Sequence, residues 1–203
     1  MFLNLLDTAK GASIRAAAST QALGHFKHRG LLSVIRVTIL ILMVSAFAGT
    51  ALAQTSLPAD VLNTDIKDLK GESFRLTEGS SKVKIIFICA SWARLCDFAA
   101  KDMNKFQKSY SKRGVAIIGL TNENPTADYV NVRKFVRRNK IKFRVGWMDA
   151  KMERTFTGEK HPGLVPMVIV LNQQHQVDSK FIGYSIRETP GKLSAVLNRL
   201  THR

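Results

Sequence analysis

The sequence has few cysteines and few acidic residues for its length. Two cysteines in 203 residues are too few for a disulfide-rich scaffold or for a zinc site with four cysteine ligands. Only 15 acidic residues oppose 31 basic ones, which gives a formal net charge of +16. The content of 45% hydrophobic and 23% charged residues excludes a wholly disordered or collagen-like chain. The length suits one basic globular domain with an appendage.

The appendage lies at the N-terminus. A basic stretch at 25–29 precedes the apolar segment 31–53, which ends in the small-x-small pattern Ala51-Leu52-Ala53. This order is typical of a secretory signal peptide and predicts cleavage after Ala53. An uncleaved inner-membrane anchor formed by 31–53 is the alternative, because a segment of this length can span a bilayer of about 30 Å. Either form predicts an exported domain, periplasmic or held at the membrane.

We therefore divide the chain into an N-terminal extension with signal peptide (1–53), a linker (54–60) and a folded domain (61–203). Residues 1–24 are longer than an ordinary basic leader segment, so a true extension and a mis-assigned start both remain open. The part after Ala53 has 26 basic and 14 acidic residues, a net charge of +12. Export would place both cysteines beyond the reducing cytosol.

The periodicity of the domain alternates between strands and helices, which predicts an α/β layered fold. The apolar run 83–90 is rich in β-branched residues and suits a central strand buried on both faces. The expected elements are a hairpin with strands in 61–69 and 73–76, strand 83–90, helix 96–113, strand 115–120, helix 127–139, strand 143–147, helix 151–156, strand 166–171, its hairpin partner 176–182, and a helix from Thr189, as N-cap, to Leu200.

Residues 86–96 resemble the active-site strand and turn of the thioredoxin superfamily. Ala90-Ser91-Trp92 and Cys96 match that motif, and Gly163-Leu164-Val165-Pro166 resembles the Gly-x-x-Pro loop of the family, whose proline is cis. The order of these motifs behind a hairpin and a signal peptide is similar to the exported TlpA/ResA-like branch over residues 57–200. The resemblance implies a thioredoxin-like three-layer fold, with a mixed central sheet flanked by helices and an N-terminal β-hairpin extension.

The motif departs from the family at the redox centre, which reads Ala93-Arg94-Leu95-Cys96 in place of Cys-x-x-Cys. The first cysteine of the family is the attacking thiolate, activated at a helix N-terminus. A methyl group at position 93 excludes an internal Cys-x-x-Cys disulfide, and it removes the attacking cysteine of a peroxiredoxin as well. Ala99 also replaces an acidic residue that many relatives carry. The standard dithiol mechanism is therefore excluded.

Cys96 remains the candidate catalytic residue, because a single thiol can form a mixed disulfide with a partner. Arg94 and the helix N-terminus favour its thiolate, whereas burial would disfavour it, so an inert thiol is the alternative. Cys89 lies on the buried strand and is interpreted as a small core residue. A Cys89–Cys96 bridge is geometrically allowed but unfavoured at this spacing.

The candidate binding residues are Trp92, Val165 and Pro166, which we expect to form a groove for an extended peptide. For Trp92 the alternative is a plain core position. His161 could face Cys96 as a base, but a solvated loop histidine is the simpler interpretation. No histidine or cysteine pair has metal-ligand spacing, so neither a metal nor another cofactor is expected.

A basic run extends over residues 133–144. Its seven side chains are Arg133, Lys134, Arg137, Arg138, Lys140, Lys142 and Arg144. A solvated helix face is the default interpretation, and contact with an anionic membrane surface or an acidic partner is the alternative. Nucleic acid is not expected as a partner, because no aromatic residues are interleaved with the basic ones.

Two functions follow from these patterns. The first is an exported thioredoxin-like protein that is non-catalytic or weakly redox-active and binds an envelope protein or peptide. The alternative is a thiol-disulfide oxidoreductase that acts through the single Cys96, in envelope redox chemistry or cytochrome maturation as the resemblance implies. Loss of the attacking cysteine favours the first.

Overall fold

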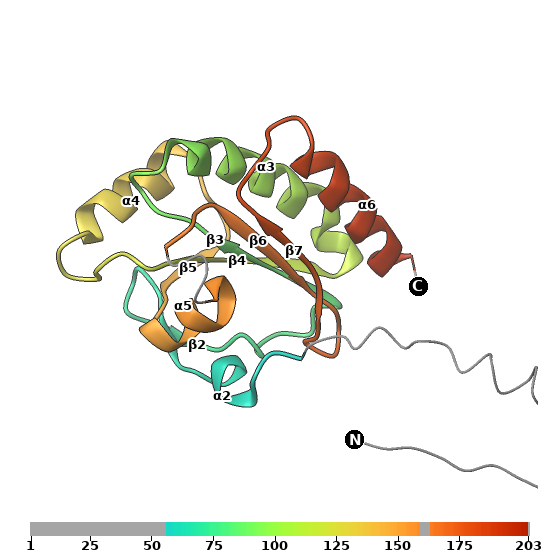
Figure 1. The fold of residues 1–203 in the computed structure, drawn as a ribbon, viewed down its shortest axis with the longest axis horizontal. Helices are drawn as coiled ribbons and strands as arrows, with labels where there is room; N and C mark the ends of the chain where they lie inside the picture. Colours follow the sequence, from blue (N-terminus) through green and yellow to red (C-terminus); the bar gives the residue numbers. More distant parts are fainter. Residues whose placement is uncertain (1–55, 159–162, 203) are drawn as a thin grey trace, which may run out of the picture. The chain divides into compact units, whose positions relative to one another are not determined.

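A five-stranded mixed sheet forms the centre of the fold in a computed structural model that describes residues 56–158 and 163–202 (Figure 1). The strand order is β5-β4-β3-β6-β7. β3 is parallel to β4 and antiparallel to β6, and all six of its residues are buried. The strands are β3 (Val83–Ile88), β4 (Val115–Thr121), β5 (Arg144–Trp147), β6 (Met167–Leu171) and β7 (Val177–Ile182).

Helices cover both faces of this sheet (Figure 1). One face carries α3 (Arg94–Tyr110), α4 (Tyr129–Arg138) and α6 (Thr189–Thr201), and the other carries α2 (Ala59–Leu62) and α5 (Ala150–Thr157). Alternate residues of β3 pack into two hydrophobic cores, one on each face of the sheet. Phe87 lies in the core beneath α3, α4 and α6, whereas Ile86 and Ile88 lie in the core beneath α2 and α5. The predicted three-layer α/β fold with a mixed sheet is confirmed.

The N-terminal hairpin is shorter than expected. It pairs β1 (Ile66–Lys67) with β2 (Ser73–Phe74), and Gly71 has a φ of 85° in the turn between them. The expectation of a strand from residue 61 is wrong, because residues 59–62 form α2. The N–H groups of Val61 and Leu62 both donate to the Pro58 carbonyl, which is the hydrogen-bond pattern of a helical turn and not of a strand.

Several element boundaries differ from the expected ones. Helix α3 begins at Arg94, not at Cys96, and after Tyr110 it continues as the 3-10 turn η1 (Ser111–Arg113) up to Gly114. Helix α4 begins at Tyr129 because the Asn124 side chain accepts the backbone N–H groups of residues 126 and 127 and holds them in a turn.

The start of the last helix and the linker also differ. Glu188, not Thr189, is the N-cap residue of α6, and the Thr189 hydroxyl accepts the backbone N–H of Ser185. Ser56 bridges to Gln176, so the folded part includes residues from the expected linker. Among the described residues, every helix lacks the length or the apolar character needed to cross a bilayer. The segment 31–53 and the cleavage site after Ala53 lie outside the described residues.

Gly146 brings the hairpin against the edge of the main sheet. A Cβ at this position would lie 2.5 Å from Cγ2 of Ile66 and 2.8 Å from Cε1 of Phe74. Gly146→Ala is expected to lower the free energy of unfolding by about 1–3 kcal/mol, because these buried side chains must shift. Urea denaturation of the two proteins measures this change in the free energy of unfolding. Gly191→Ala, where a Cβ meets nothing within 4 Å, is the control and should be neutral or stabilising. Equal effects of the two substitutions would contradict the packing argument.

Lys84 is the exception to the apolar character of β3. It is buried, and its Nζ lies 3.1 Å from Nε2 of His175 in the β6–β7 turn. Burial lowers the pKa of Lys84, and burial together with the Lys84 charge lowers the pKa of His175. The folded protein therefore resists protonation of His175 more than the unfolded chain does.

This arrangement predicts an acid-sensitive stability. As pH falls below about 6.5, the unfolded chain takes up a proton that folded His175 resists, so the free energy of unfolding should decrease until the lowered pKa is reached. Urea denaturation at pH 7.5 and pH 5 measures the decrease. His175→Asn, which tolerates the left-handed backbone of this residue (φ 58°), should show a smaller decrease. The same decrease in both proteins would refute the role of His175.

Candidate functional site

The site lies at the edge of the sheet where β3 and β4 end and β6 begins. Ile88, the last residue of β3, pairs with Leu120 of β4 and with Met167 of β6. The segments that follow β3 and β4 and the loop that precedes β6 therefore meet at one edge. The Val165–Pro166 bond is cis, as the motif predicts. His161 lies outside the described residues.

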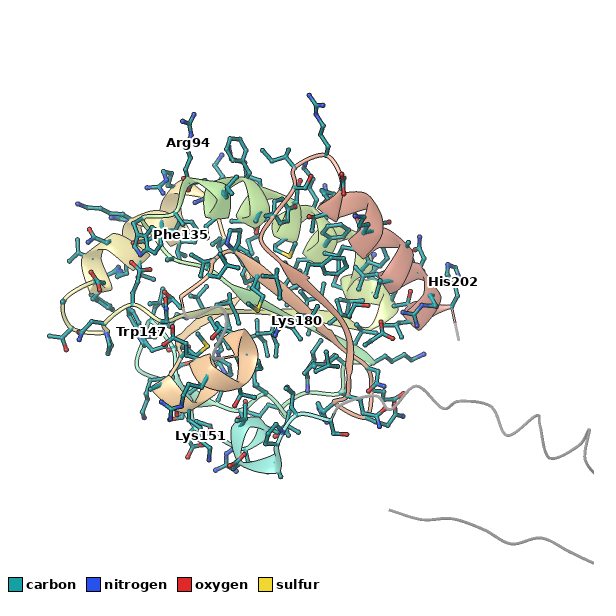
Figure 2. The ribbon with its side chains drawn as sticks, in the orientation of Figure 1. Arg94, Phe135, Trp147, Lys151, Lys180 and His202 are labelled. Carbon is teal, nitrogen blue, oxygen red and sulfur yellow. The ribbon has the colours of Figure 1, made fainter. Side chains whose placement is uncertain are left out.

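Ala93 is the N-cap residue of α3 and has extended backbone geometry (φ −85°, ψ 111°). Its N–H donates to the Ala90 carbonyl, and its own carbonyl accepts the N–H of Cys96 at 2.9 Å. Its methyl group is half-buried and packs against the core. Arg94 is exposed and points away from the fold (Figure 2). The helix N-terminus is thus in place, but it carries no side chain that can react.

Cys96 lies one turn further along α3 and is fully buried. Its Sγ accepts the backbone N–H of Ala90 at 3.3 Å. Cys89 is also buried, and both thiols are free. A hydrogen bond with Cys96, together with burial and the charges of Cys96 and Glu123, raises the pKa of the Cys89 thiol well above its usual range. This environment keeps the Cys89 sulfur protonated, and burial closes both sulfurs to a disulfide in solution.

Glu123 is a functional candidate that sequence reasoning missed. Its carboxylate accepts the backbone N–H of Ser91 at 2.6 Å, the Ser91 hydroxyl at 2.5 Å and the Thr121 hydroxyl at 2.9 Å. The residue is buried, and no cation forms an ion pair with it among the described residues. The two hydrogen bonds from Ser91 to this charged acceptor fix the turn that carries Ala90-Ser91-Trp92, and the third ties the carboxylate to Thr121 at the end of β4. The sequence signal that could have indicated Glu123 is the polar segment 121–124, which directly follows the buried strand predicted at 115–120.

The predicted groove residues differ in exposure. Trp92 is 71% exposed, which contradicts a core position. Val165 is half-buried and Pro166 is buried, while the neighbouring Leu164 is 38% exposed. Neither backbone polar group of Val165 makes a backbone hydrogen bond within the part of the chain that the structure describes. This edge therefore offers an exposed indole and the backbone N–H and carbonyl of Val165, which pair with no other described backbone group.

Within residues 56–158 and 163–202, no three histidine, cysteine or acidic side chains are grouped as a metal site would require. The chemistry available at this edge is therefore that of two buried thiols, one buried carboxylate and an exposed apolar surface.

Comparisons with known proteins agree with this geometry. The model of the AhpC/TSA family matches residues 54–180. The thiol-disulfide oxidoreductase ResA of Geobacillus thermodenitrificans is 28% identical over 117 residues, which is 54% of this chain. The match covers 66% of ResA, so this chain spans just under two thirds of the length of that relative.

Solved structures share the fold. A thioredoxin-family thiol:disulfide interchange protein from Chlorobium tepidum has a TM-score of 0.61 at 19% identity, covering 75% of this chain and 99% of its own. A secreted disulfide oxidoreductase of Mycobacterium tuberculosis has a TM-score of 0.56 at 13% identity, covering 70% and 100%. Peroxiredoxin Q of Xanthomonas campestris has a TM-score of 0.57 at 12% identity, covering 72% and 97%. At these identities the structural likeness shows the fold alone. Taken with the matching family model, it means that this chain belongs to the AhpC/TSA family of thioredoxin-like proteins and is related to its thiol-disulfide oxidoreductases.

Proposed function

We propose that this protein is an exported thioredoxin-like binding protein that holds an extended segment of an envelope protein or peptide without dithiol exchange. One observation carries the proposal: position 93, at the N-terminus of α3, holds a methyl group, and the remaining thiol of the motif, Cys96, is fully buried. Thiol exchange needs a thiolate that can reach a partner sulfur. Position 93 supplies no thiol, and burial puts the Cys96 sulfur out of reach of a partner sulfur.

The binding part of the proposal rests on the edge formed by Trp92, Val165 and Pro166. An extended segment can add main-chain hydrogen bonds to the free backbone groups of Val165. The exposed indole of Trp92 supplies apolar area, and large aromatic residues contribute strongly to such interfaces. A peptide would therefore be recognised by its extended backbone and by an apolar side chain against Trp92.

Export is supported by the basic stretch 25–29, the apolar segment 31–53 and the small-x-small ending at Ala53. It agrees with the secreted disulfide oxidoreductase among the structural relatives. An uncleaved 31–53 segment would instead hold the same domain at the inner membrane. In both cases the binding edge would meet envelope proteins.

Binding at the edge is tested with carboxymethylated, fluorescein-labelled insulin B chain, an extended peptide whose sulfurs are blocked. Trp92→Ala is expected to weaken binding at least about tenfold in fluorescence anisotropy, because the exposed indole supplies the apolar contact. Val130→Ala removes another exposed apolar side chain, on α4, and should change the affinity by less than about twofold. No binding by the parent protein, or equal losses in the two variants, would refute the peptide-binding edge.

The absence of catalysis is tested by Ala93→Cys. A sulfur at this N-cap position gains from the helix dipole and stands three residues before Cys96, so the variant should form an internal disulfide. With dithiothreitol as the reductant that regenerates its dithiol, it should reduce insulin with multiple turnovers. The parent should stay at the background of its Cys96→Ser variant. Ala127→Cys adds an exposed thiol with no cysteine three residues away and should remain inactive.

Two outcomes would overturn this part of the proposal. Turnover by the parent that Cys96→Ser abolishes would establish a monothiol enzyme. Failure of Ala93→Cys to form a disulfide under oxidising conditions would show that position 93 does not correspond to the attacking cysteine.

A further inference from the structure

A hollow of about 740 Å³ lies between α3 and the end of α4. We call it the α3–α4 groove. Six of its ten lining residues are lysine or arginine, and none is acidic. The lining residues are Lys101, Asn104, Lys105, Gln107, Lys108, Ser111, Arg138, Asn139, Lys140 and Lys142. Three residues of the basic run at 133–144, Arg138, Lys140 and Lys142, form one wall of this groove, and the lysines of α3 form the other.

Four of these six cations have no ion pair within the described part of the chain: Lys101, Lys108, Lys140 and Lys142. The other two, Lys105 and Arg138, are paired with Asp102 at 2.7 Å and Asp97 at 2.8 Å. The groove therefore keeps a net positive charge of four after its internal pairs are counted.

Helix stability explains the α3 lysines only in part, through the Lys105–Asp102 pair and the place of Lys108 in the last turn. Lys101, Lys105 and Lys108 follow one another at spacings of four and three residues, where like charges destabilise a helix. The helix dipole favours cations near the end of α4 and Lys108 in the last turn of α3, but it does not account for Lys101 or Lys105, which lie further from the C-terminus of α3. An anionic ligand in the groove would relieve the repulsion among them.

The groove continues toward the candidate site. A second hollow of about 260 Å³ shares Lys101, Arg138 and Asn139 with it and extends to Arg94, next to the N-cap Ala93. From Arg94 to Ser111 the helix rises about 25 Å. An extended chain covers this length with seven or eight residues at about 3.3 Å each.

The walls of the groove also contain hydrogen-bond acceptors. The amide oxygens of Asn104 and Asn139 are buried and have no hydrogen-bond partner among the described residues. A peptide offers carboxylates and N–H donors on one chain. A bilayer surface is flat on this scale, whereas the groove is a hollow between two helices.

We propose that the α3–α4 groove binds an acidic peptide segment of a partner protein, seven or eight residues long, with its carboxylates against the unpaired lysines. This proposal does not depend on what occupies the edge at Trp92, because no residue of the groove belongs to that edge. The basic surface expected from residues 133–144 is thereby extended to α3. The proposed ligand is a protein segment and not a membrane.

The test measures binding of fluorescein-labelled octaglutamate and octaglutamine to the full chain in a neutral detergent. Lys101→Glu/Lys108→Glu should weaken octaglutamate binding at least about tenfold. Lys67→Glu/Lys180→Glu changes the net charge equally at exposed positions outside the groove, and should weaken binding less than about threefold, because screening limits distant charges. Circular dichroism checks folding, and Lys101→Gln/Lys108→Gln replaces the first pair if it fails to fold.

Three results would overturn the proposal. The first is equal binding of octaglutamate and octaglutamine by the parent protein. The second is equal weakening of octaglutamate binding by the two double variants, which would show that binding follows the net charge of the protein and not the groove. The third is loss of binding to phosphatidylglycerol–phosphatidylcholine vesicles in the groove variant with octaglutamate binding unchanged, which would assign the lysines to a membrane contact.

Discussion

The pairing of β3 with β4 on one side and β6 on the other is the constraint on which the rest of the structure depends. β3 is hydrogen-bonded along both edges and buried on both faces, so a slip by one residue would move Phe87 and Ile88 into the wrong cores. The fixed register sets where each strand ends. It therefore brings Ser91, Glu123 and Val165 to one edge, although they are far apart in the sequence.

The burial that fixes this edge also underlies the proposed absence of thiol exchange. An attacking thiol needs exposure and a positive environment that stabilises its thiolate. Here the thiols lie under the turn, and the carboxylate of Glu123 adds negative charge that raises the pKa of the Cys89 thiol. Glu123 instead holds the Ser91 turn in place. The family's scaffold is thus maintained by hydrogen bonds that do not require a reactive cysteine.

Periodicity was sufficient for the α/β class, the main strands and the order of the helices, because each of these is encoded over a few neighbouring residues. The helix at 59–62 was missed, since one turn is too short to show a period. Glu123 was missed because nothing local links it to Ser91, 32 positions away. The same limit applies to the α3–α4 groove: Lys101 and Lys108 look like a solvated helix face until α4 is placed beside α3.

The two proposed surfaces, the edge at Trp92 and the α3–α4 groove, both approach the N-terminus of α3. A thiol-exchange protein holds its partner through a transient covalent bond, which the Ala93 methyl group cannot form. A partner that places an acidic segment along α3 delivers its next residues beside Arg94, which is two positions from Trp92 in the sequence. The second contact is then intramolecular, so two weak sites act at high effective concentration. Two adjacent non-covalent contacts can thereby hold a partner that a thiol-exchange protein would hold through a mixed disulfide.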